Sequence, residues 1–344
     1  MKNNSLRLSS RLSSHLPPHL LLNAMLTCTF FMLPILNVHA QSTDADFAQF
    51  VKPRNNAAIE TLARERLAKS SKDDVAIWYL ARAVSGDVKK RDELTLRAEQ
   101  CIKDLPQSAR CHSALGSLYG TLAMSGGMTA GMKYAGKIKD MMLKAVELEP
   151  KSFDMRRDLN QYYLQAPGIV GGSVRKAIEN SNDFGKIDAP RGQLLRAEVH
   201  IYEKEFTQAE ALLRAIKSTE ADLNESVISA MTSLGYVLVN NREPAKAKKI
   251  FEQQIAANDK NANAHFGLGR ALLEQKNADA AIQSMERGLA LDPKITGHYR
   301  LGLAYQLKGD KPKAIVAFQQ FLTYQKTGKS AEDATTRLEE LKRG

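Results

Sequence analysis

The chain has 344 residues, of which 43% are hydrophobic and 25% charged, so it can bury a sizeable core and is neither disordered nor fibrous. Three cysteines in this length exclude a disulfide-built scaffold and a multi-cysteine zinc module. The formal net charge is +11, but no basic block gathers the excess Lys and Arg. No nucleic-acid partner is therefore expected, and the charge would steer the protein toward acidic partners or anionic surfaces.

The first 40 residues have the pattern of an export signal. They contain no Asp or Glu, and their only Lys or Arg residues are Lys2, Arg7 and Arg11. A nearly continuous apolar run over residues 20–36 follows. Val38 and Ala40 put small residues three before and one before a cut, which predicts cleavage after Ala40 and a periplasmic protein that can associate with the outer membrane.

Two alternatives for this segment stay open. The apolar run is at the short limit for a membrane span, so it could be retained as an anchor. Lipidation at Cys28 is the other alternative, although Thr27 stands where a smaller residue is expected. A mitochondrial presequence fits an uninterrupted apolar run poorly.

From residue 50 onward, apolar residues recur every three or four positions, which indicates helices. An amphipathic helix is predicted over residues 55–69, ahead of a repeat. The repeat is clearest in the pairs Leu234-Gly235, Leu268-Gly269 and Leu301-Gly302, which are 34 and 33 residues apart. Each pair precedes an Ala and, four residues later, a large apolar residue: Ala247 with Phe251, Ala281 with Met285, and Ala314 with Phe318.

This pattern resembles the tetratricopeptide repeat, in which Leu-Gly, then Ala-x3-Phe, then Pro mark one helix-turn-helix unit. Small residues let the two helices approach closely, and the large ones fill the space between them. Further units are expected around Ala98, Ala145, Ala177 and Ala209. The resemblance implies an all-α fold, a right-handed superhelical solenoid of stacked helix-turn-helix repeats.

The expected organisation has four parts. Residues 1–40 form the signal peptide, and residues 41–74 form a linker and a capping helix. About seven repeats occupy residues 75–326, with an insertion between Gly120 and Gly136. A capping-box-like start at Ser330 predicts a final capping helix within residues 327–344.

A narrower resemblance rests on residues 144–150 and 162–173, which are similar to a family of exported bacterial tetratricopeptide proteins without a settled activity. Tetratricopeptide proteins bind partners on the inner face of their first helices. By this resemblance, the partner-binding residues are Tyr236, Val239, Phe266, Arg270, Leu273, Tyr299 and Leu303. Aromatic residues beside an Arg suit an extended peptide or a helix. Position five holds Ser113, Thr232, Phe266 or Tyr299, so the carboxylate clamp of chaperone-binding repeats is not expected.

A glycine loop offers a different kind of site. Gly171, Gly172 and Ser173 lead into a helix that carries Arg175 and Lys176, and free amides at a helix start beside cations can hold an anion. No Walker pattern follows. The plain alternative is a stiff turn in which Ser173 caps the next helix.

Sulfur and imidazole groups give weaker signals. Met124, Met128 and Met132 recur every four residues and could bind copper(I), contact a peptide, or simply pack. His112, His265 and His298 share one repeat position and are expected in successive layers of the core, too far apart for one metal.

Cys101 and Cys111 flank one turn, so a disulfide and two buried thiols are both open.

The sequence therefore favours a non-catalytic scaffold that binds proteins of the bacterial cell envelope, with possible peripheral contact with the membrane surface. No metal and no cofactor is expected, because no catalytic order of Ser, His and Asp and no His-Glu-x-x-His motif can be defended. The alternative is a binder of a small anion or a metal at the glycine loop or the methionines.

Overall fold

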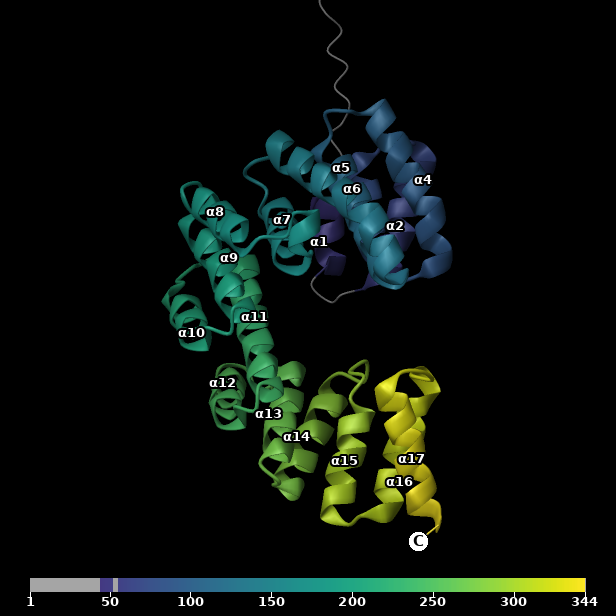
Figure 1. Cartoon of the computed structure of the whole chain (residues 1–344), viewed down its shortest axis with the longest axis vertical. Coiled ribbons are helices and arrows are strands. Elements are labelled where there is room, and N and C mark those ends of the chain that lie inside the picture. The colour runs from purple at the N-terminus through teal and green to yellow at the C-terminus, as the bar shows by residue number, and fades with distance from the viewer. Residues whose placement is uncertain (1–43, 52–54, 344) are drawn as a thin grey trace, which may run out of the picture. The chain divides into compact units, whose positions relative to one another are not determined.

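The computed structural model describes residues 44–51 and 55–343, and every regular element within them is a helix (Figure 1). The predicted signal segment, its apolar run and Cys28 lie outside these residues. In the part of the chain that is described, no helix combines the length and the apolar character needed to cross a membrane.

Seven consecutive helical hairpins make up most of the described chain. Two helices precede them, α1 (Ala45–Val51) and α2 (Asn56–Lys69), and α17 (Lys329–Arg343) follows them. The hairpins are α3 (Asp74–Val84) with α4 (Val88–Asp104), α5 (Ala109–Ser125) with α6 (Gly127–Leu148), α7 (Phe153–Gln165) with α8 (Val174–Gly185), α9 (Ala189–Tyr202) with α10 (Phe206–Ala215), α11 (Ala221–Asn240) with α12 (Pro244–Ala257), α13 (Ala262–Glu274) with α14 (Ala278–Leu291), and α15 (His298–Lys308) with α16 (Lys311–Tyr324). A 3-10 turn, η1 (Gly168–Val170), lies between α7 and α8.

Polar residues in the turns start the helices. The side chain of Asp73 accepts a hydrogen bond from the Ala76 amide at 2.9 Å, and Asn261 accepts one from the Ala264 amide at 3.0 Å. Such a bond satisfies an amide that has no partner inside the helix. The same N-cap contact is made by Asn55, Asp87, Ser108, Ser152, Ser173, Asp188, Asn277 and Asp310.

The repeat register sets the core. The small residue predicted in every second helix is at most 1% exposed: Ala98, Ala145, Ala177, Ala209, Ala247, Ala281 and Ala314. Each helix packs on its neighbours in the chain, and the first helices α9, α11 and α13 also contact one another in sequence. The chain therefore buries its apolar residues between successive helices, as a solenoid does.

The Leu-Gly pairs mark close contacts between the two helices of a hairpin. A Cβ added at Gly235 would lie 2.6 Å from the ring of Phe251, and one at Gly302 would lie 2.7 Å from the ring of Phe318. Any side chain at these positions would have to displace a fully buried Phe. The structure confirms that a small residue here lets the paired helix approach.

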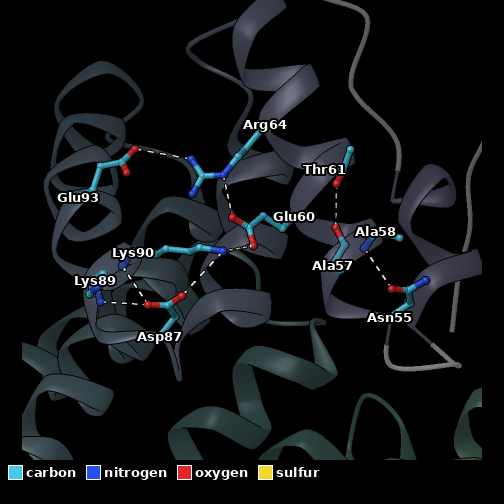
Figure 2. Close-up of polar contacts among 10 residues, drawn as sticks. All are labelled: Asn55, Ala57, Ala58, Glu60, Thr61, Arg64, Asp87, Lys89, Lys90 and Glu93. Carbon is cyan, nitrogen blue, oxygen red and sulfur yellow. Dashed lines mark hydrogen bonds and ion pairs between the residues drawn. The ribbon is translucent and has the colours of Figure 1, made fainter.

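Helix α2 is joined to the first hairpin by side-chain contacts with α4 (Figure 2). Glu60 accepts hydrogen bonds from Arg64 Nε at 2.9 Å and from Lys90 Nζ at 2.8 Å, and Arg64 also lies 3.7 Å from Glu93. The bond from Lys90 is the main cause that lowers the pKa of Glu60. These contacts join α2 to the first hairpin of the stack.

The insertion lengthens one hairpin and forms no separate domain. Helix α5 has 17 residues and α6 has 22, and they meet at Gly126 and Gly127. Gly127 adopts a φ of +68°, a conformation that glycine takes without steric cost. The inserted residues are therefore part of the helices α5 and α6 and of the turn between them.

Candidate functional site

Two adjoining hollows near the C-terminus gather most of the predicted partner-binding residues. The larger has a volume of about 650 Å³, the smaller about 310 Å³, and Arg300 lines both. We call the pair the C-terminal groove. The larger hollow is lined by Phe266, Arg270, Thr296, Gly297, Tyr299, Arg300, Phe321, Tyr324, Gln325, Thr327, Gly328, Lys329 and Ser330, and the smaller by Leu273, Glu274, Lys276, Arg300, Leu303, Gln306, Leu307 and Arg337.

Helices α13 and α15 bring five of the seven predicted residues to this groove. Those five are Phe266, Arg270, Leu273, Tyr299 and Leu303. The two residues from α11 are not part of it. Val239 is only 4% exposed and belongs to the core, so a contact between its side chain and a partner is a wrong expectation. The hydroxyl of Tyr236 donates to the Asn263 carbonyl at 2.9 Å, and burial raises its pKa to about 12.

Two guanidinium groups give the groove its positive charge. Arg270 Nη2 donates to Asn240 Oδ1 at 2.9 Å, whereas the buried Nε has no hydrogen-bond partner among the described residues. Burial lowers the pKa of Arg270, and the neighbouring charge of Arg300 lowers it further. The nearest carboxylate oxygen to Arg300 belongs to Glu274, at 3.9 Å. The two cations therefore repel each other and are only weakly neutralised.

An aromatic wall stands beside these cations and is held in place. The Tyr299 hydroxyl donates to Asp333 Oδ2 at 2.7 Å, and Arg337 Nε donates to the same oxygen at 2.6 Å. Burial first, and then Asp333, raises the pKa of Tyr299. The bond from Arg337 is the main cause that lowers the pKa of Asp333. The ring of Tyr299 is thus fixed between α15 and α17.

Several groove residues lay outside the sequence prediction. Arg300, Phe321 and Tyr324 line the larger hollow, and so does Lys329 at the start of α17. The pattern of inner-face positions missed Arg300 because it directly follows a predicted position. Phe321 and Tyr324 lie on a second helix, which the family pattern assigns to the outer face. A signal was present in the clustering of aromatic residues at the end of α16.

The glycine loop uses its amides internally. The amides of Gly171, Gly172 and Ser173 donate to the carbonyls of Gly168, Pro167 and Tyr163, respectively. Ser173 Oγ caps α8 by accepting from the Lys176 amide at 3.3 Å, and the Arg175 side chain is 80% exposed. A Cβ on Gly172 would lie 1.7 Å from the Ala166 carbonyl oxygen, so the close approach of backbone explains this glycine. These contacts support the structural turn with Ser173 as the cap of α8, and the anion site stays a prediction.

The three methionines do not form one helical stripe. Met124 lies on α5, and Met128 and Met132 lie on α6, beyond the break at Gly126 and Gly127. They are 81%, 88% and 52% exposed, so packing in the core is a wrong explanation for them. Within the described residues, no group of three or more His, Cys, Asp or Glu is placed to hold a metal ion.

Two of the three predicted histidines make the same local contact. His112 Nε2 lies 3.1 Å from the Pro106 carbonyl oxygen, and His265 Nε2 lies 2.9 Å from that of Asp259. Each imidazole therefore meets the carbonyl six residues earlier. His112 is buried as expected, whereas His265 and His298 are only half-buried, which corrects the expectation of three core residues.

A disulfide joins the first two hairpins. Cys101 lies near the end of α4 and Cys111 in the first turn of α5, and the structure bonds their sulfurs, with Cα atoms 5.6 Å apart. Both residues are buried. The bond clamps the turn between one repeat and the next.

Comparison with known proteins places the repeats in a family. Models described as tetratricopeptide repeat match residues 232–294 and 297–341. No curated protein matched the sequence. Among solved structures, yeast Tom70 is similar with 16% identity and a TM-score of 0.61, over 84% of this chain and 59% of that chain. A chain of the APC/C Cut9-Hcn1 hetero-tetramer is similar with 16% identity and a TM-score of 0.50, over 88% of this chain and 57% of that one.

The chain thus spans less than two thirds of either structure, and at this identity the likeness shows the fold alone. The two matched segments cover the last hairpins, where the Leu-Gly pairs are most regular. Each of the remaining hairpins buries an alanine of its second helix in the same way, although their spacing is less regular. The chain is a tetratricopeptide repeat protein.

Proposed function

We propose that this protein is a non-catalytic scaffold of the bacterial cell envelope that captures an acidic segment of a partner protein in the C-terminal groove. Tetratricopeptide repeats are modules for protein–protein interaction. The observation that carries the proposal is the pairing of Arg270 and Arg300, weakly neutralised, with the fixed aromatic wall of Tyr299.

The chemistry of the groove selects the partner. A carboxylate on the partner would accept charge-assisted hydrogen bonds from Arg300, whose side chain is 37% exposed and whose ion pair with Glu274 is long, at 3.9 Å. The rings of Tyr299 and Tyr324 would cover apolar side chains of the same segment. An extended segment with alternating acidic and apolar residues fits both features.

The proposed location rests on two features. Residues 1–40 read as an export signal, and the Cys101–Cys111 disulfide suits an oxidising compartment such as the periplasm. Export would leave the chain basic, which favours acidic partners and anionic envelope surfaces.

The test is an in-cell crosslinking pull-down of the full-length chain with a C-terminal tag. The variant Arg300→Glu/Lys329→Glu reverses two charges in the groove. The matched control, Arg287→Glu/Arg343→Glu, makes the same charge change on exposed side chains outside the groove. We expect envelope proteins that are captured by the wild type and the control to be lost from the groove variant.

N-terminal sequencing of the recovered chain tests the location at the same time. A start at Gln41 would support export and cleavage. A start at Met1 would contradict cleavage, and partners captured equally by all three proteins would contradict the groove.

A further inference from the structure

A second surface, far along the chain from the C-terminal groove, carries exposed apolar side chains. A hollow of about 380 Å³ lies between the end of α5, the start of α6, and α7 with the turn that follows it. Figure 1 labels these three helices. We call it the methionine groove. Its lining consists of Gly120, Ala123, Met124, Met128, Gly131, Met132, Ala135, Ile138, Met142, Asp158, Gln161, Tyr162, Gln165, Ala166, Pro167 and Val170.

The floor of this groove offers no unpaired polar group to a ligand. Ala135, Ile138 and Tyr162 are buried. The Tyr162 hydroxyl already contacts the carbonyls of Ala135 and Val170, and the Asp158 carboxylate is paired with Arg82 at 3.1 Å. A ligand would therefore bind the floor through apolar contacts.

The lips of the groove are apolar as well, and they protrude. Met124 and Met128 are more than four-fifths exposed, and Ile169 of the adjoining turn is 84% exposed. Methionine side chains are flexible and adapt to the shape of an apolar partner. An acyl chain would fill the floor and leave the lips exposed, whereas a flat membrane surface would meet the lips and leave the floor empty. A helix, about 10 Å wide, covers both.

The charge beside the groove is positive. Lys139 of α6 is half-buried, and the aliphatic part of its side chain lies next to Gly171. Within the described chain, Lys139 forms no ion pair. Lys133 and Lys137 contact the rings of Tyr134 and Tyr119 and likewise have no carboxylate partner among the described residues. Within the sequence of α6, Asp140 is the only acid between Lys133 and Lys144. Of the acids nearby, Glu99 is bonded to the Tyr119 hydroxyl and Asp158 is paired with Arg82.

From the apolar floor and lips and this unpaired positive charge, we propose that the methionine groove binds an amphipathic helix of a partner protein, with acidic residues flanking its apolar face. The apolar face would cover Met124, Met128 and Met132, and an acid at its edge would meet Lys139. This site is separate from the C-terminal groove, so the hairpin α5–α6 would give the scaffold a second partner.

A displayed library of helical sequences tests the proposal with the full-length protein. The library holds sequences of about 18 residues, roughly 27 Å when helical. Sequences are selected on the wild type and counter-selected on Met124→Glu/Met128→Glu, whose altered side chains are exposed. The matched control Val88→Glu/Leu96→Glu adds the same charge at exposed apolar positions of α4.

We expect the enriched sequences to place apolar residues at helical spacing with Asp or Glu beside them. They should bind the wild type and the control alike, and bind the methionine variant at least about tenfold more weakly, because two apolar contacts are lost. Lys139→Glu should shift the flanking preference from acidic to basic residues.

Three results would overturn the proposal. One is no enrichment of the wild type over the methionine variant. Another is enrichment of sequences without an apolar helical face or with basic flanks. The third is flotation with phosphatidylglycerol vesicles that depends on Met124 and Met128 while no helix is selected, which would assign the groove to the membrane.

Discussion

The C-terminal hairpins α11–α16 and the hairpin α5–α6 use the same repeat differently. In the C-terminal hairpins, each Leu-Gly pair is pressed against a large side chain of the paired helix, such as Phe251 or Phe318. In α5–α6 the matching Gly116 faces Met141 and Met142, at 3.3 Å. These two helices have 17 and 22 residues and meet at Gly126 and Gly127. Close packing therefore fixes the core of the regular repeats, while the lengthened repeat gains surface.

The difference extends to how each region is held. The stack around α4 and α5 carries the Cys101–Cys111 disulfide, and its lengthened hairpin exposes Met124 and Met128. The α11–α16 region contains no cysteine and depends on ring-against-glycine contacts. In a solenoid each repeat contacts only its neighbours, so the two regions should respond separately to local changes.

The largest expected effect comes from breaking the disulfide. Cys101→Ala/Cys111→Ala opens a short loop, because the two residues are 10 apart in sequence, and should lower the free energy of unfolding by about 3 kcal/mol. Urea unfolding measures the loss. Hydrogen exchange followed by mass spectrometry should show faster exchange in α3–α6 and no change in α11–α16.

The reductant response of the same two proteins provides the control. Dithiothreitol should destabilise the wild type and leave the double variant unchanged. Faster exchange in both regions would show that the stack unfolds as one unit. Two free thiols in protein purified from its native compartment would show that the disulfide does not form there.

The next effect compares two glycines. Gly269→Ala places a Cβ 2.8 Å from the Ala281 carbonyl oxygen and 2.9 Å from the Met285 amide nitrogen, which are backbone atoms that cannot move alone. We expect a loss of about 2 kcal/mol after the better helix propensity of Ala is counted. Gly116→Ala meets methionine side-chain atoms at 3.3 Å and the Ile138 carbonyl oxygen at an ordinary 3.8 Å, and should change stability by less than about 0.5 kcal/mol.

Thermal and urea unfolding of the two single variants make the comparison directly. Equal losses would mean that both regions are packed equally closely at these glycines. A larger loss for Gly116→Ala would reverse the conclusion and assign the tighter contact to the lengthened hairpin.

The repeat register made most of the fold predictable, because one small residue per unit recurs at a position that only close packing explains. All seven predicted alanines are buried, and the expected helices at residues 55–69 and from Ser330 appear as α2 and α17. The surface was less predictable. Whether Met128 packs or protrudes depends on where the helix breaks, and sequence periodicity did not place that break at Gly126 and Gly127.

The candidate site was predicted in part for the same reason. Inner-face positions follow from the repeat, so Arg270 and Tyr299 were found. The contribution of Arg300 and Tyr324 depends on how α15, α16 and the cap α17 close around the hollow, which is a property of three helices together. Val239 was misassigned because the inner-face register does not show that its side chain is buried in the core cluster that α11 forms with its neighbouring helices.

A smaller expected loss than that of Gly269→Ala concerns Asp333, which fixes the wall of the C-terminal groove. Asp333→Asn removes the charge that accepts from Tyr299 and Arg337, and the carboxylate is 38% exposed, so solvent screens the loss to less than about 1 kcal/mol. The pKa of Asp333 is lowered in the folded chain, chiefly by Arg337. Its stabilising contribution is therefore present above the ordinary Asp pKa and is lost as the pH falls through the lowered folded value.

Urea unfolding of the wild type and Asp333→Asn at a series of pH values tests this sign. The stability difference between them should be largest near neutral pH and should shrink below about pH 4. The control Glu339→Gln breaks an exposed pair with Arg343 on the same helix and should show almost no difference at any pH. A stability difference that grows as the pH falls would mean that folding disfavours the ionised form of Asp333. The hydrogen bond from Tyr299 to Asp333 would then not explain how the Tyr299 ring is held.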